Sequence, residues 1–177
     1  MERSTVDTAG LFFAWLGHDI EEFVTMRETS RKLLGRLPER VPVPAEWRAH
    51  GLPQRHIAVG MSTMGLLMAA ASADGYRTGG RSAFYQTVLL GFGLHGIGHV
   101  GMAMGMRGYA SGVLTSPTVV IPFWLAATRD LNARGVPPRR SVLLAAVSIP
   151  VSVWAAHGVA YALTRRRAEP SSPDGVR

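Results

Sequence analysis

The sequence predicts an all-α fold, a polytopic membrane bundle of about five transmembrane helices, and three observations lead to this prediction. Of the 177 residues, 47% are hydrophobic and only 18% are charged, a balance that favours a membrane protein over a soluble one. The apolar residues gather into five runs. The basic residues, all arginine except one, cluster in the stretches between those runs, as they do in the loops of membrane proteins.

The first run, residues 9–26, is the least ordinary of the five because it contains His18-Asp19-Ile20-Glu21-Glu22. Each charge at the centre of a membrane helix is unfavourable by roughly 2.5–3.5 kcal/mol on insertion scales. The segment is therefore tolerable in a membrane only if these groups face the bundle interior or a ligand. Whether it crosses the membrane or re-enters on the same side is left open.

The remaining segments follow from apolar length and from helix-breaking residues. Between the first two runs, residues 27–56 are a basic, proline-bearing loop with a short interfacial helix over residues 28–37. The third run is rich in glycine, including a GxxxG pair at Gly101 and Gly105, and small residues let membrane helices approach closely. Pro117 and Pro122 predict a kinked or broken fourth helix. The predicted spans are 9–26, 57–73, 85–106, 110–128 and 141–163, in one domain of residues 1–167 followed by a disordered tail, 168–177.

Five spans place the two termini on opposite sides of the membrane. With the loop 27–56 inside, the inner segments carry twelve basic residues and the outer segments seven. The positive-inside rule then predicts a multi-pass protein of the plasma membrane with its N-terminus outside and its C-terminus in the cytoplasm. The pI of about 11 raises nucleic-acid binding as an alternative, but five apolar spans argue against a soluble nucleic-acid-binding protein. The expected partners are the lipid bilayer and a small-molecule substrate.

Ionisable side chains on three of these spans lie at similar depths, on a rise of 1.5 Å per residue. On a helix, His18 shares a face with Glu21 and Glu22, while His95 and His99 are one turn apart. We expect a buried cluster of these five residues, with His157 as a possible further member. The chain has no cysteine, so thiolate ligands are excluded. The predicted metal ligands are His18, Glu21, Glu22, His95 and His99, and the predicted catalytic groups are Glu21, Glu22 and His95.

A cluster of imidazoles and carboxylates without thiolates favours iron over zinc. Iron would permit oxidative chemistry, and zinc would permit hydrolytic or Lewis-acid chemistry. Other residues that resemble metal ligands have simpler interpretations. Met61, Met64 and Met68 form a helical stripe that is better explained by packing than by copper. His50 and His56, in or beside the basic loop, are interpreted as solvated.

The string His18-Asp19-Ile20-Glu21-Glu22 near the start of a small multi-span protein resembles the HXXEE-domain family of bacterial integral membrane proteins. That family has a second motif, Asn-x-x-x-His, which residues 95–99 match except that His95 stands in the place of Asn. The match covers roughly residues 9–125, and Ser111 stands near a proline position of the family. Further residues follow at matching spacing: Arg107, Tyr109, Gly112 and Thr115. The resemblance implies a membrane-embedded, metal-dependent enzyme, with His95 as an additional ligand.

Three functions remain open from the sequence. The first is an integral membrane metalloenzyme of bacterial secondary or small-molecule metabolism. The second is a metal-free biosynthetic enzyme that forms an N–N bond by diazotising an amino group with nitrite, using buried Glu and His as acid and base. In size and span number the chain is similar to such transmembrane enzymes of actinobacterial natural-product pathways. The third is a transporter or metal-binding membrane protein without catalysis, which the broken fourth span favours.

Overall fold

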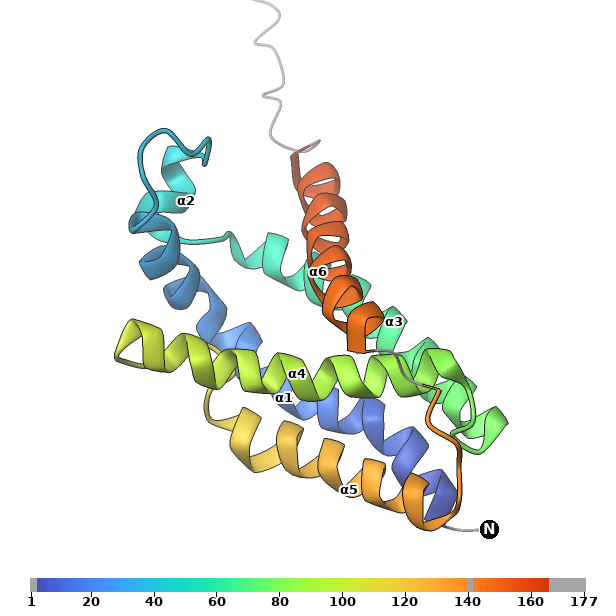
Figure 1. Ribbon diagram of the computed structural model, residues 1–177. Helices are drawn as coiled ribbons and strands as arrows, with labels where there is room; N and C mark the ends of the chain where they lie inside the picture. Colours follow the sequence, from blue (N-terminus) through green and yellow to red (C-terminus); the bar gives the residue numbers. More distant parts are fainter. Residues whose placement is uncertain (1–2, 140–141, 166–177) are drawn as a thin grey trace, which may run out of the picture.

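The computed structural model describes residues 3–139 and 142–165, and within these ranges the chain is helical without any strand (Figure 1). This confirms the predicted all-α fold class. Residue 141, the first of the predicted fifth span, and the tail 168–177 lie outside the described residues. The elements are α1 Arg3–Gly35, α2 Ala45–His50, α3 Gln54–Thr78, α4 Ala83–Met106, η1 Ser116–Val120, α5 Ile121–Ala133 and α6 Val142–Arg165.

The long helices run back and forth in chain order, with α1, α3, α4 and α5 alongside one another (Figure 1), and α6 packs against α3 and α4. The turn after α3 lies beside the end of α5, where Arg134 donates a hydrogen bond to the carbonyl of Gly79. The turn after α4 lies at the opposite end, against the C-terminal half of α1. These two turns therefore lie at opposite ends of the helices that they connect.

Three of the described helices are long and apolar enough to cross a membrane: α3, α4 and α6. They cover the second, third and fifth predicted spans. The first predicted span, 9–26, lies inside the much longer helix α1. The fourth, 110–128, is not one helix, because residues 110–115 form a turn before η1. The three helices fit a membrane protein, while the number of crossings remains a prediction.

Near Pro117 and Pro122, where a kinked or broken helix was predicted, the structure changes from π-helix to α-helix, and the predicted span is interrupted earlier, in the turn before η1. The structure places Pro117 in η1, a five-residue π-helix, and Pro122 in the first turn of α5. Proline has no backbone N–H, so it is tolerated where the i→i−4 ladder is interrupted or has not yet begun. The irregular backbone of η1 lies against α1 and α4, with Ser116 and Val120 buried and Pro117 and Thr118 exposed.

Glycines in α4 allow η1 and α5 to pack closely against this helix, but these glycines are not the predicted GxxxG pair. A Cβ atom added at Gly93 would lie 2.2 Å from the ring of Trp124, and one at Gly96 would lie 2.7 Å from Val120. Gly101 and Gly105 have no such neighbour within 4 Å among the described residues. The close approach is therefore made by the middle of α4, one turn before His99.

The basic segment 27–56 is more ordered than predicted. No proline interrupts residues 3–35, so α1 continues to Gly35 and absorbs most of the expected interfacial helix. The Arg48 guanidinium then holds the following loop by donating hydrogen bonds to four backbone carbonyls, those of Leu34, Leu37, Pro38 and Val41. These bonds place α2 against the C-terminal end of α1.

Candidate metal centre

Four of the five predicted ligands meet between α1 and α4. His18 and Glu22 are one turn apart on α1, and His95 and His99 are one turn apart on α4. Each residue offers one ligand atom, and these four atoms lie within 4.8 Å of one another. His18, Glu22 and His99 are buried, whereas His95 is about one-third exposed. The i, i+4 spacing on two facing helices is thus sufficient to build the cluster.

The Glu22 carboxylate is at the centre of this cluster. Its Oε2 lies 3.6 Å from Nε2 of His18 and 3.7 Å from Nε2 of His95, and its Oε1 lies 3.3 Å from Nε2 of His99. The two Nε2 atoms of His95 and His99 are 2.8 Å apart. All three imidazoles therefore present the same ring nitrogen to the same carboxylate.

The proton position on His18 follows from its hydrogen bonds. Thr115 Oγ1 donates its single hydrogen to Glu21 Oε2 at 2.5 Å, so it can only accept from Nδ1 of His18, which lies 2.7 Å away. His18 therefore carries its proton on Nδ1, and its Nε2 has a free lone pair. A second hydrogen bond that fixes the tautomer in this way is typical of histidines that bind metal.

Glu21 lies beside the cluster and not in it, which differs from the expectation. Successive residues on an α-helix are rotated by about 100°, so the adjacent carboxylates of Glu21 and Glu22 point in different directions. Glu21 accepts hydrogen bonds from the Tyr109 hydroxyl, from the backbone N–H of Leu114 and from both the N–H and the hydroxyl of Thr115. Burial and the bond to Glu21 raise the pKa of the Tyr109 phenol. Glu21 thus holds the turn that follows α4.

This turn, residues 107–115, is fastened to a polar stripe on α1. Glu21, Thr25 and Thr29 recur every four residues and so share one face. Thr25 Oγ1 lies 2.9 Å from Ser111 Oγ, and the backbone N–H of Ser111 donates to Thr29 Oγ1. This stripe was not predicted from the sequence, because the first helix was expected to end at Met26. The four-residue recurrence of polar groups was the pattern that could have revealed it.

Gly112 lies at the point where the turn passes the cluster. Its φ of +78° is in the left-handed region that favours glycine. A Cβ atom at this position would lie 2.7 Å from Cε1 of His18 and 2.9 Å from Nδ1 of His99. The turn therefore packs against Cε1 of His18 and Nδ1 of His99, and the Nε2 atoms of both rings point into the cluster.

The cluster contains potential metal-ligand atoms that have no hydrogen-bond partner in the protein. Among the described residues, Nε2 of His18 and Oε1 of Glu22 are buried without a hydrogen-bond partner. Buried polar atoms in native proteins are nearly always satisfied, so such atoms indicate a ligand or an ion. Three imidazole nitrogens and a carboxylate oxygen are a donor set for iron or zinc. The residues present therefore fit a single divalent metal ion.

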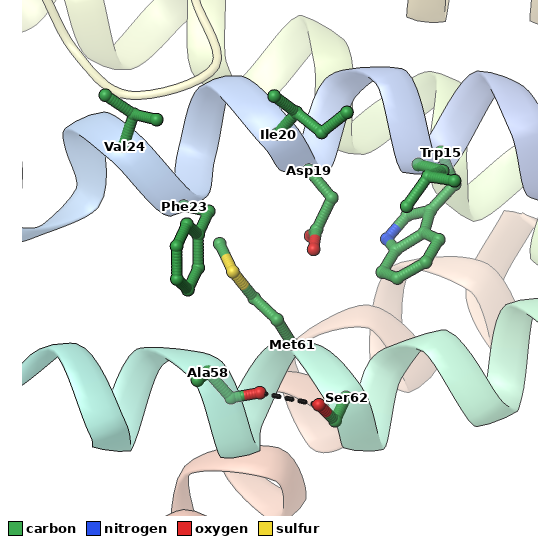
Figure 2. Close-up of a pocket in the computed structure, with 9 residues that line it drawn as sticks. Trp15, Asp19, Ile20, Phe23, Val24, Ala58, Met61 and Ser62 are labelled. Atoms are coloured by element: carbon green, nitrogen blue, oxygen red, sulfur yellow. Dashed lines mark hydrogen bonds between the residues drawn. The ribbon is translucent and has the colours of Figure 1, made fainter.

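The cluster is accessible from a cavity of about 360 Å³ between α1, α3, α4 and α6. Glu22, His95 and His99 line this cavity, and His18 lies behind them. Asp19 points toward α3, where it lines both this cavity and a neighbouring pocket that it shares with Phe23 and Met61 (Figure 2). A small molecule in the cavity would therefore reach the cluster from the side of Glu22, His95 and His99.

The other histidines differ from the cluster and from one another. His157 lies with His56, whose Nε2 is 2.9 Å from Nδ1 of His157, and so it is not among the four clustered residues. The expectation that His56 is solvated is wrong, because its exposed fraction is 1%. Its position in the first turn of a long apolar helix explains this burial. His50 is exposed, near Glu46, as expected.

The three apolar helices fit a helical membrane protein, and its His/Glu cluster could hold a metal ion. The family described as "Protein of unknown function with HXXEE motif" matches residues 9–127, and the chain therefore belongs to the HXXEE family. His18, Glu21 and Glu22 are the residues of that motif. Neither the curated proteins nor the solved structures contain a match to the chain.

Proposed function

We propose that this protein is an integral membrane metalloenzyme that holds one metal ion, iron rather than zinc, with His18, Glu22, His95 and His99. The observation that supports this most directly is the pair of unsatisfied buried atoms at the cluster, Nε2 of His18 and Oε1 of Glu22. Leaving such atoms without a partner costs about 1–3 kcal/mol each, and an ion would satisfy both.

The four ligands have different roles in this proposal. His18, Glu22 and His99 are buried, and the turn 107–115 fixes the two histidines, so these three form the rigid part of the site. Iron bound there would supply redox chemistry, and zinc would supply Lewis-acid chemistry. His95 is more exposed and lines the cavity, so it is the member of the cluster best placed to exchange a proton with a substrate.

The cavity determines the kind of substrate that can reach the cluster. Its volume of about 360 Å³ lies within the range of roughly 300–1,000 Å³ found for small-molecule sites. Most of its lining side chains are apolar, including Trp15, Ile57 and Phe92. The proposed substrate is therefore a mostly apolar small molecule that reaches the site from the membrane.

The test is the metal content of the full chain purified in detergent without chelator, measured by ICP-MS. We expect about one iron or zinc ion per chain in the wild type, and a loss of most of it in Glu22→Gln and His99→Ala, because each removes a buried ligand. Glu28→Gln and His50→Ala are matched controls, since both residues are exposed and outside the cluster. Wild-type protein without metal after supplementation with iron or zinc would refute the metalloenzyme.

A second candidate function, metal-free acid–base catalysis such as diazotisation of an amine with nitrite, is favoured by one contact. The Nε2 atoms of His95 and His99 face each other at 2.8 Å, so a metal-free site must hold a proton between them. Glu22 lies within 4 Å of both rings and would stabilise the positive charge that forms when the pair takes up a further proton. Consumption of nitrite by metal-free protein, lost in Glu22→Gln, would support this candidate over the first.

A further inference from the structure

A second pair of histidines lies apart from the cluster, where α3 begins and α6 passes over it. The rings of His56 and His157 are stacked at 24° with an Nε2–Nδ1 distance of 2.9 Å, and the Trp47 ring contacts His56 edge-on. None of the ion pairs among the described residues includes either of the two histidines. His56 is 1% exposed, and its Nδ1 is buried without a hydrogen-bond partner. This nitrogen therefore lacks a hydrogen-bond partner among the described residues, although His56 lines a cavity.

The cavity that reaches the metal centre also reaches this pair. Glu22, His95 and His99 line one part of it, and His56 and His157 line another. On α3 its lining residues extend from His56 to Met68, and on α6 from Ser148 to His157. At 1.5 Å per residue these stretches are roughly 18 Å and 13 Å long. The cavity is thus elongated, with a polar group of residues at each of two separate places.

The rest of the cavity wall is mostly apolar and rich in methionine, with Asp19 as its charged exception. Unbranched thioether side chains adapt to ligands of variable shape, and methionine is common on surfaces that bind flexible apolar groups. A hydrocarbon chain is the kind of ligand that this wall accommodates best. The methionines that line the cavity are Met26, Met61, Met64, Met68 and Met102.

We infer that this cavity binds a long-chain carboxylic acid, with the carboxyl group at His56 and His157 and the hydrocarbon chain extending towards the cluster. A carboxyl group suits the unpartnered Nδ1 of His56 in either tautomer, because it accepts a hydrogen bond when ionised and donates one when protonated. That this acid is the substrate of the metal centre rests on the function proposed above.

The charge around this end of the cavity also favours an acid. Residues 27–55 contain seven basic residues and only three acidic ones. Helix α2 belongs to this segment, and its Trp47 covers His56. The positive potential of such a segment attracts an anionic head group and opposes a cationic one. The charged residues that line the cavity itself, Asp19 and Glu22, are acidic, so this preference for an anion comes from the basic segment around the His56 end and not from the lining.

The test uses the full chain in nanodiscs and palmitic acid that carries a diazirine in the middle of its chain. After photolysis, mass spectrometry identifies the labelled residues. We expect label on cavity residues of α3 and α6, such as Met64 and Ser152, and competition by palmitic acid but not by its methyl ester. His157→Gln should reduce this labelling roughly tenfold, the effect of losing one hydrogen bond to a charged group. His50→Gln, outside the cavity, should not reduce it.

A second pair of variants keeps the test valid if His157→Gln does not fold. Ser152→Phe fills the cavity from α6 and should abolish the labelling, whereas Val151→Phe, on the exposed face of the same helix, should leave it unchanged. Label confined to exposed residues such as Leu143, without competition, would overturn the inference.

Metal content separates the two proposals. Saturable labelling of protein that binds no metal would refute only the metalloenzyme, and metal-loaded protein without saturable labelling would refute only the fatty-acid site.

Discussion

Thr115 Oγ1 lies 2.7 Å from Nδ1 of His18 and connects that ring to the carboxylate of Glu21. The two acidic residues of the motif therefore have different roles. Glu22 contacts the three imidazoles, and Glu21 orients the His18 ring through the hydroxyl group of Thr115. Thr115 is 97 residues from His18 along the chain. The turn after α4 is thus as much a part of the site as the motif on α1.

Thr115→Val should weaken metal binding without removing a ligand. Valine has the shape of threonine but cannot bridge His18 and Glu21, so the His18 ring loses the bond that fixes its tautomer. Loss of such an outer partner typically reduces metal affinity 10- to 100-fold. The measurement is competition with a coloured chelator. Thr118→Val is the control, because the Thr118 hydroxyl is exposed and bonds only to the carbonyl of Leu114. Equal affinities in both variants would contradict the proposed role of Thr115.

Gly112→Ala should damage the site more than the same change at Gly108. The positive φ of Gly112 makes alanine unfavourable by about 1–2 kcal/mol, and its Cβ would overlap His18 and His99. Gly108, in the same turn, has its nearest Cβ neighbour at 4.0 Å, so Gly108→Ala should change little. Thermal unfolding and metal content of the two variants are the measurements. A metal-loaded Gly112→Ala protein of wild-type stability would show that the turn does not pack on the rings as described.

Glu21→Gln and Glu22→Gln should separate the two carboxylates of the motif. Glu21→Gln replaces one acceptor oxygen with an NH₂ group that faces hydrogen-bond donors of the turn. We therefore expect the unfolding free energy to fall by about 1–2 kcal/mol. The protein should still bind the metal, with reduced affinity. Glu22→Gln should remove most of the metal. Denaturant titration and ICP-MS on both variants give the comparison. The reverse pattern would place Glu21, and not Glu22, among the ligands.

Local spacing explains what the sequence could predict here. The pairs His18/Glu22 and His95/His99 each follow an i, i+4 pattern, so their shared faces and their helices were predictable. The glycines of α4 also predicted a close approach, although the structure uses Gly93 and Gly96 for it. Only the meeting of the two helices required an argument from membrane depth.

The contributions that sequence reasoning missed depend on distant parts of the chain. Glu21 and Glu22 are equivalent in composition, and their separate roles appear only when the turn 107–115 packs on α1. The pairing of His56 with His157 joins residues 101 positions apart, on helices whose contact no local pattern specifies. The length of α1 was underestimated because charge was taken to end it, although no proline interrupts it before Gly35.

The predicted orientation is testable because the chain has no cysteine, so a single introduced cysteine is an unambiguous reporter. Glu39→Cys lies in the basic segment after α1, and Arg81→Cys lies in the turn after α3, at the opposite end of the bundle. If the basic segment is cytoplasmic, a membrane-impermeant maleimide added to intact cells should label Arg81→Cys and not Glu39→Cys. Permeabilised cells are the control for reactivity. Labelling of Glu39→Cys alone in intact cells would reverse the orientation.

His95→Asn tests whether the fourth ligand is an addition to the family's site. The family motif has Asn at this position, and His95 is the most exposed of the four clustered residues. His18, Glu22 and His99 would still supply three ligands, a number sufficient for catalytic metal sites. We therefore expect His95→Asn to retain metal with an affinity reduced by about tenfold, and His99→Asn to lose it, because only His99 is buried against Gly112. Equal loss in both variants would make His95 an essential ligand, and no loss in either would move the metal away from α4.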